Sequence, residues 1–173
     1  MPATAPSSIY HATHHQAAHA VTAVMLGFPV ERISVTGSAT EENWGILEAG
    51  IEDIAAVCAA GFAMDRILGL NSEAAWEGCR NDRDLLSAIY ADRTGMALAD
   101  AELTDLFHRG VSSSESILRH QNVQRGIEAM AASLVILFDA GESCMQEEDI
   151  RRIVAPLIGG PCIGERQLAT QSA

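Results

Sequence analysis

Lysine is absent from this 173-residue chain, and basic residues of any kind are scarce. The eleven basic residues are all arginines and stand against 23 acidic residues, so the formal net charge at pH 7 is −12. A phosphate backbone is bound through a basic surface, so this balance excludes a nucleic-acid partner. We interpret the use of arginine alone as a compositional bias. An acidic chain attracts a basic or neutral peptide more readily.

Closely spaced cysteines and long apolar runs are also missing. The four cysteines show neither C-x-x-C spacing nor the density of a secreted disulfide scaffold. The longest apolar run, residues 129–138, is interrupted by Ser133 and is too short to cross a bilayer. Residues 1–30 contain no Asp, Glu, Lys or Arg, but they lack the positive start and cleavage pattern of a secretory signal. We therefore expect a soluble, cytoplasmic protein with no membrane partner.

What the sequence does contain is a histidine-rich, helix-forming stretch near its start. Residues 10–27 read YHATHHQAAHAVTAVMLG, and Gly27 with Pro29 ends the helical pattern. His15 and His19 are four residues apart, so they lie on one face of a helix and their imidazoles can converge on one ion. Neutral imidazole is the commonest protein ligand of zinc. The spacing therefore predicts a metal-binding helix.

Gln16 occupies the position at which an H-E-x-x-H motif carries its catalytic glutamate. That glutamate takes a proton from the zinc-bound water, whereas a glutamine amide can hold a water but has no carboxylate to accept a proton. We expect zinc binding with little or no hydrolysis, because general-base catalysis contributes about 10²–10⁴-fold. Two origins remain open: a natural pseudopeptidase, or an engineered Glu→Gln change that traps an inactive enzyme. We favour the second because the rest of the site looks intact.

The histidines also have simpler interpretations than a zinc site. With six histidines in the chain, a chance H-x-x-x-H pattern is not rare. His11, His15 and His19 also form an i, i+4, i+8 stripe, which fits a polar helix face. A metal site that uses all three is unfavourable, because three successive turns cannot easily wrap one ion. A helical structural protein with incidental histidines is therefore a further function class.

Three segments of the chain follow one another in an informative order. The histidine helix and the apolar residues after it occupy residues 10–35, residues 60–69 read AGFAMDRILG, and residues 78–86 read GCRNDRDLL. In this order they resemble the protease domain of FtsH-type ATP-dependent zinc peptidases. There the histidine helix runs into a first strand, and an Ala-Gly-x-Ala-Ala-Glu-x-x-x-Gly helix and a Gly-Ala-Ser-Asn-Asp segment follow. The resemblance covers about residues 9–93.

This resemblance implies a zinc metallopeptidase, in which Asp82 corresponds to the family's third zinc ligand. Chemistry favours such a residue independently, because His15 and His19 need at least one more protein ligand to leave a catalytic zinc site with one open position. Asp84, two residues further along the chain, is the alternative candidate for the third zinc ligand. The simpler interpretation of Asp82 is a carboxylate at a helix N-terminus, where the helix macrodipole stabilises its negative charge.

Asp65 and Glu77 are more distant candidates for the third ligand. Glu48, at the edge of an expected strand, could contact a peptide bound by strand addition. Besides Gln16, the chain departs from the family pattern at Ala18, which replaces the usual glycine, and it contains no ATPase domain or membrane anchor. We therefore expect hydrolysis of a specific protein or peptide without ATP-driven unfolding, and a homo-oligomer is possible.

The sequence predicts an α+β fold that is mostly helical, with a zincin-like metal helix followed by a small β-sheet and a helical bundle. A single metallopeptidase-like domain is expected over residues 1–158, followed by a flexible tail at 159–173. The expected strands are residues 30–35 and 44–47. The expected helices are residues 9–26, 51–69, a short helix from Asn81, 100–108, 112–139 and 146–157. The longest of them is expected to begin with a capping box formed by Ser112 and Glu115.

Overall fold

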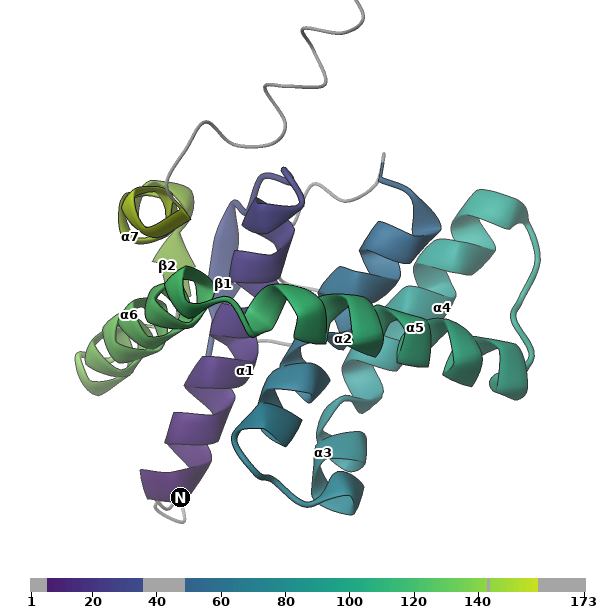
Figure 1. Cartoon of the computed structure of the whole chain (residues 1–173), viewed down its shortest axis with the longest axis horizontal. Coiled ribbons are helices and arrows are strands. Elements are labelled where there is room, and N and C mark those ends of the chain that lie inside the picture. Colours follow the sequence, from purple (N-terminus) through teal and green to yellow (C-terminus); the bar gives the residue numbers. More distant parts are fainter. Residues whose placement is uncertain (1–5, 36–48, 143, 159–173) are drawn as a thin grey trace, which may run out of the picture.

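The computed structural model describes residues 6–35, 49–142 and 144–158, and within them the chain forms seven helices and one two-stranded sheet (Figure 1). The helices are α1 (Pro6–Met25), α2 (Ile51–Ile67), α3 (Ser72–Gly78), α4 (Arg80–Thr94), α5 (Asp100–Leu118), α6 (Gln121–Asp139) and α7 (Glu147–Ile158); the strands are β1 (Arg32–Ser34) and β2 (Cys144–Gln146). The predicted class, mostly helical with a small sheet, is confirmed. The expected strand at 44–47, Glu48 and the tail at 159–173 lie outside the described residues.

Helix α2 forms the centre of the core. Every residue from 54 to 65 is buried, as expected of a helix that is apolar on nearly all sides. The helix α5 packs along one side of α2 and α1 along another. The contact with α5 is close because Gly110 faces the carbonyl group of Ala55, where an added Cβ would overlap it. The Ser114 hydroxyl donates a hydrogen bond to the Ala56 carbonyl oxygen at 2.5 Å across the same contact.

Helix α1, which carries the histidines, lies between α2 and α6. It has no acidic residue in its first turn and no basic residue in its last, so its stability comes from burial more than from charge. Small side chains allow the close approach of its neighbours: Ala17, Ala18, Ala20, Val21 and Ala23 are fully buried. The helix ends as the sequence predicts, because Gly27 adopts a left-handed conformation (φ 86°) two residues after Met25.

The sheet joins two segments that are far apart in the sequence. Strand β1, which follows α1, pairs antiparallel with β2, which precedes α7, in a register that places Ile33 opposite Met145. Both of these side chains are buried. The sequence did not predict β2, because three residues are too few to show an alternating pattern. Among the described residues, no helix is both long and apolar enough to span a membrane.

The predicted helix over residues 112–139 is wrong, because two helices cover that stretch. Figure 1 shows α5 and α6 one after the other, and the chain turns between them at His120, whose backbone is extended (φ −69°, ψ 130°). Ser112 lies inside α5, where its hydroxyl donates to the His108 carbonyl oxygen at 3.2 Å. At the start of α5, the Glu102 carboxylate instead accepts a hydrogen bond from the Ala99 N–H at 3.0 Å.

The helix α3 was also not predicted, whereas the ends of α1, α2 and α7 agree with the prediction to within about three residues.

Candidate metal centre

Side chains from α1 and α4 meet at one point beside α2. His15 and His19 project from α1, Asp82 from the first turn of α4, and their ligand atoms all lie within 4.8 Å of one another. The Asp82 carboxylate lies 3.3 Å from His15 Nε2 and 3.6 Å from His19 Nε2. The three predicted ligands are therefore close enough to hold a metal ion together.

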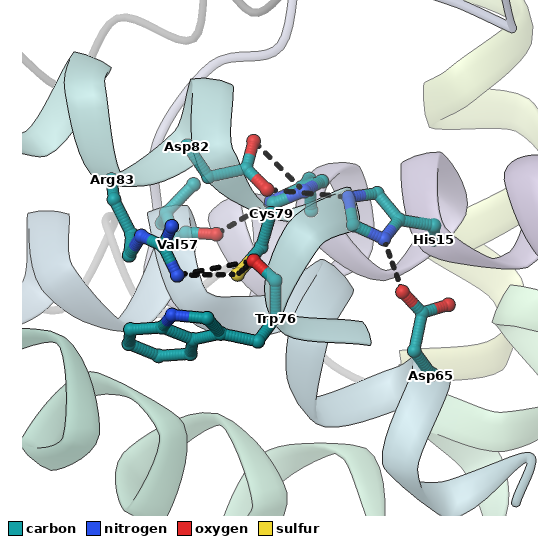
Figure 2. Close-up of polar contacts among 8 residues, drawn as sticks. His15, Val57, Asp65, Trp76, Cys79, Asp82 and Arg83 are labelled. Carbon is teal, nitrogen blue, oxygen red and sulfur yellow. Dashed lines mark hydrogen bonds and ion pairs between the residues drawn. The ribbon is translucent and has the colours of Figure 1, made fainter. Parts of the chain in front are cut away.

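Each histidine is held by its other ring nitrogen. His15 Nδ1 lies 2.9 Å from Asp65 Oδ2 on α2 (Figure 2), and His19 Nδ1 lies 2.7 Å from the Val57 carbonyl oxygen on the same helix. A carbonyl oxygen only accepts hydrogen bonds, so the Nδ1 of His19 carries the proton. Both rings therefore turn Nε2 toward Asp82. Metal-binding histidines are held in this way, with the second nitrogen donating to a carboxylate or carbonyl group.

The charges around the histidines favour a cation between them. In neutral rings oriented in this way, both Nε2 lone pairs would face the Asp82 carboxylate, and this repulsion is relieved by a proton or a metal ion. Burial alone would lower the pKa of His15, but Asp65 and Asp82 outweigh it and raise the pKa to about 10. Burial would likewise raise the pKa of Asp82, yet His19 and His15 hold it below its usual range. Two imidazoles and one ionised carboxylate are a donor set that fits a divalent metal.

Gly61 on α2 makes room for the His15 ring. A Cβ built at this glycine would overlap three atoms of the imidazole, so the ring lies directly against the α2 backbone. Any side chain at position 61 would therefore displace the ring from this position. Sequence reasoning missed this role, because nothing local distinguishes a glycine that accommodates a ring from a helical glycine that faces open space.

The junction between α3 and α4 fixes the position of Asp82. Arg83 Nη1 donates to the Trp76 carbonyl oxygen at 3.0 Å, and its guanidinium carbon lies 3.8 Å from the centroid of the Trp76 ring (Figure 2). The Cys79 thiol donates to the same carbonyl oxygen at 3.2 Å. Burial raises the pKa of Cys79 to about 12, so the thiol stays protonated and is a poor metal ligand.

A pocket of about 280 Å³ opens beside His15 and Asp82, two of the three candidate ligands. It is lined by His15, Gln16 and His11 from α1, together with Asp65 and Asp82. Gln16, at the position of the expected general base, therefore lines the same space as His15 and Asp82. Its Oε1 atom is buried and has no hydrogen-bond partner within the described part of the chain.

The rival third ligands do not join the histidines. Asp84 is exposed on α4, and Glu77 is exposed and pairs with Arg80 at 3.2 Å. Asp65 is near, but it contacts the nitrogen of His15 that faces away from Asp82. A signal for its role was present in the sequence, because a carboxylate within an apolar helix is buried only with a partner.

No protein-family model matches the chain, and no curated protein matches it either. Its class is therefore defined by fold and site: a mostly helical α+β protein in which a His-His-Asp group, able to hold a metal ion, lies beside a small pocket. The resemblance to FtsH-type protease domains stays a prediction.

Proposed function

We propose that this chain is a zinc metallopeptidase of the FtsH type that acts on a specific protein or peptide in the cytoplasm. His15, His19 and Asp82 would hold the zinc ion. The observation that carries the proposal is the orientation of both rings, which present Nε2 toward Asp82 while Nδ1 is held by a partner on α2. Two histidines and a carboxylate with one open position are a typical donor set of catalytic zinc.

Each side chain at the site has a part in the proposed reaction. Zinc, when bound, polarises a peptide carbonyl group and lowers the pKa of water. Asp65 holds the His15 ring in place, and the pocket beside it admits the peptide bond. Gln16 can orient a water through its amide group but cannot take up a proton. Hydrolysis by this form of the protein is therefore expected to be slow or absent.

Zinc content tests the metal site directly. Protein purified without a histidine tag or chelator is expected to hold about one zinc ion per chain by mass spectrometry, since the site supplies one set of three ligands. His19→Ala and Asp82→Ala should both lose it, whereas His120→Ala, at an exposed position before α6, should keep it. A parent protein without zinc, or zinc retained in both ligand variants, would refute the site.

Peptidase activity tests the proposed reaction. Restoring the carboxylate with Gln16→Glu should raise the rate of cleavage by about 10²–10⁴-fold, as expected when a general base is supplied. The measurement is cleavage of a broad fluorogenic peptide library by zinc-loaded protein. A folded, zinc-loaded Gln16→Glu protein that cleaves no peptide would count strongly against a peptidase.

Gln16 itself favours a second candidate, a natural pseudopeptidase that binds peptides or regulates a partner without cutting. The zinc site would then serve as a binding or structural element. The residue at position 16 in the natural coding sequence separates the two candidates. Glutamine there favours the pseudopeptidase, and glutamate favours the enzyme.

A further inference from the structure

Among the described residues of the pocket wall, His11 is the one titratable residue that the proposed metal site does not use. Of the nine described residues that line the pocket, four are titratable: His11, His15, Asp65 and Asp82. Two of these are candidate metal ligands, and Asp65 is bound to His15 Nδ1 at 2.9 Å. His11 is left, and it lies one helical turn before His15 on the same face of α1.

The other histidines of α1 have hydrogen bonds that explain their positions. His14 Nδ1 lies 2.8 Å from the Tyr10 carbonyl oxygen, and the Nδ1 atoms of His15 and His19 contact α2. His11 Nδ1, in contrast, is buried and has no hydrogen-bond partner among the residues that the structure describes. The ring as a whole is only partly buried and lines the pocket, so a ligand there can exchange a proton with it.

We infer that His11 is the proton acceptor of this pocket, in the place of the carboxylate that Gln16 lacks. The inference rests on the proposed function and extends it, because it assigns the residual hydrolysis of this form to a particular side chain. Imidazole is suited to accept a proton near neutral pH. The other titratable groups that line the pocket are His15 on α1, Asp65 on α2 and Asp82 on α4.

The proton transfers balance over the reaction. One O–H bond of a water held by the Gln16 amide breaks, and its proton goes to a ring nitrogen of His11. The water oxygen forms a bond to the carbonyl carbon of the substrate. The C–N bond of the peptide then breaks, and His11 returns the proton to the departing amine nitrogen. The net reaction adds one water across the peptide bond and leaves His11 neutral.

Acetohydroxamic acid tests this role without a known substrate. It is small enough for the pocket, and it gives up a proton when its oxygens bind a metal ion. Cobalt(II)-loaded protein, followed by visible absorption, should bind it about tenfold or more weakly after His11→Gln, because the released proton has lost its acceptor. Cobalt affinity itself should be unchanged, since His11 is not a ligand. Adding Gln16→Glu to His11→Gln should restore the hydroxamate affinity, and His120→Gln is the control.

The outcomes separate this inference from the proposed function. If His11→Gln leaves hydroxamate affinity unchanged, or if it weakens cobalt binding by the same factor, His11 is not the proton acceptor and the metal site stands. If the parent protein binds no cobalt, the proposed function fails and this inference fails with it. Restored affinity in the double variant shows that the loss in His11→Gln is not a folding defect.

Discussion

At the scale of single residues, the site depends on how α2 receives the His15 ring. Asp65 holds Nδ1 and Gly61 leaves space for the imidazole, so Nε2 is directed at Asp82. The i, i+4 spacing of the two histidines was sufficient to predict their convergence, since it depends only on helix geometry. The assignment of Asp82 required the family resemblance, because its neighbour Asp84 is chemically identical. The position of Asp65 in an apolar helix indicates that it has a partner, but local spacing does not identify that partner as His15, 50 residues away.

Removal of the Asp65 carboxylate should weaken metal binding. Asp65→Asn keeps the size of the side chain but loses the charge that orients His15 and increases its basicity, so we expect zinc affinity to fall by about 10–100-fold. The measurement is competition with a chromophoric chelator at fixed pH. Asp84→Asn, on the exposed side of α4, is the matched control and should bind like the parent. Equal zinc affinity in both variants would show that Asp65 does not support the site.

The pKa of His15 makes metal binding pH-dependent. With a folded-state pKa of about 10, His15 is protonated at neutral pH and must lose this proton when a metal binds. Between pH 7 and 9, zinc affinity should therefore rise about tenfold per pH unit, with about one proton released per zinc ion. Titration calorimetry in two buffers with different ionisation enthalpies measures the release. Binding without proton release would mean that His15 is already neutral.

The same pKa shift has a consequence for folding when metal is removed with a chelator. Because the pKa of His15 is raised above its ordinary 6.5, its protonation stabilises the folded state fully below about pH 6.5. That contribution is lost as the pH rises toward 10.

At the scale of elements, two glycines allow two close helix contacts with α2. Gly61 lies under the His15 ring of α1, and Gly110 of α5 faces the Ala55 carbonyl group. The helices themselves were largely predictable from apolar spacing and from Gly27. The break between α5 and α6 was not, because Ser112 and Glu115 match a capping pattern that applies only where a helix begins. Burial of one side of α5 against α2 overrides that local preference.

Alanine substitutions at the two glycines should distinguish an effect on metal binding from an effect on helix packing. Gly61→Ala and Gly110→Ala should each lower the free energy of unfolding by about 1–3 kcal/mol, the usual cost of overpacking. Only Gly61→Ala should also weaken zinc binding, because only it displaces His15. Urea unfolding and zinc competition on the folded protein measure the two effects. Gly78→Ala, where the added Cβ meets open space, is the control for stability.

At the scale of the whole molecule, the candidate ligands connect the first helix to the middle of the chain. A metal that binds the folded protein alone stabilises it by mass action, by about 2.7 kcal/mol at a free concentration one hundred times the dissociation constant. Zinc should therefore raise the thermal unfolding temperature of the parent. Asp82→Ala should show no such shift. An equal shift in the variant would mean that zinc binds elsewhere.

The antiparallel pairing of β1 with β2 has a consequence for the order in which the protein folds. Ile33 and Met145 lie about 110 residues apart, so this pairing closes a very long loop, and contacts between distant segments form late. The helix α1 packs on α6 as well as on α2. During synthesis, both candidate histidines and Asp82 leave the ribosome long before α6 and β2 can cover α1. The nascent chain must therefore keep an almost uncharged, histidine-bearing helix partly exposed until α6 and β2 have been made.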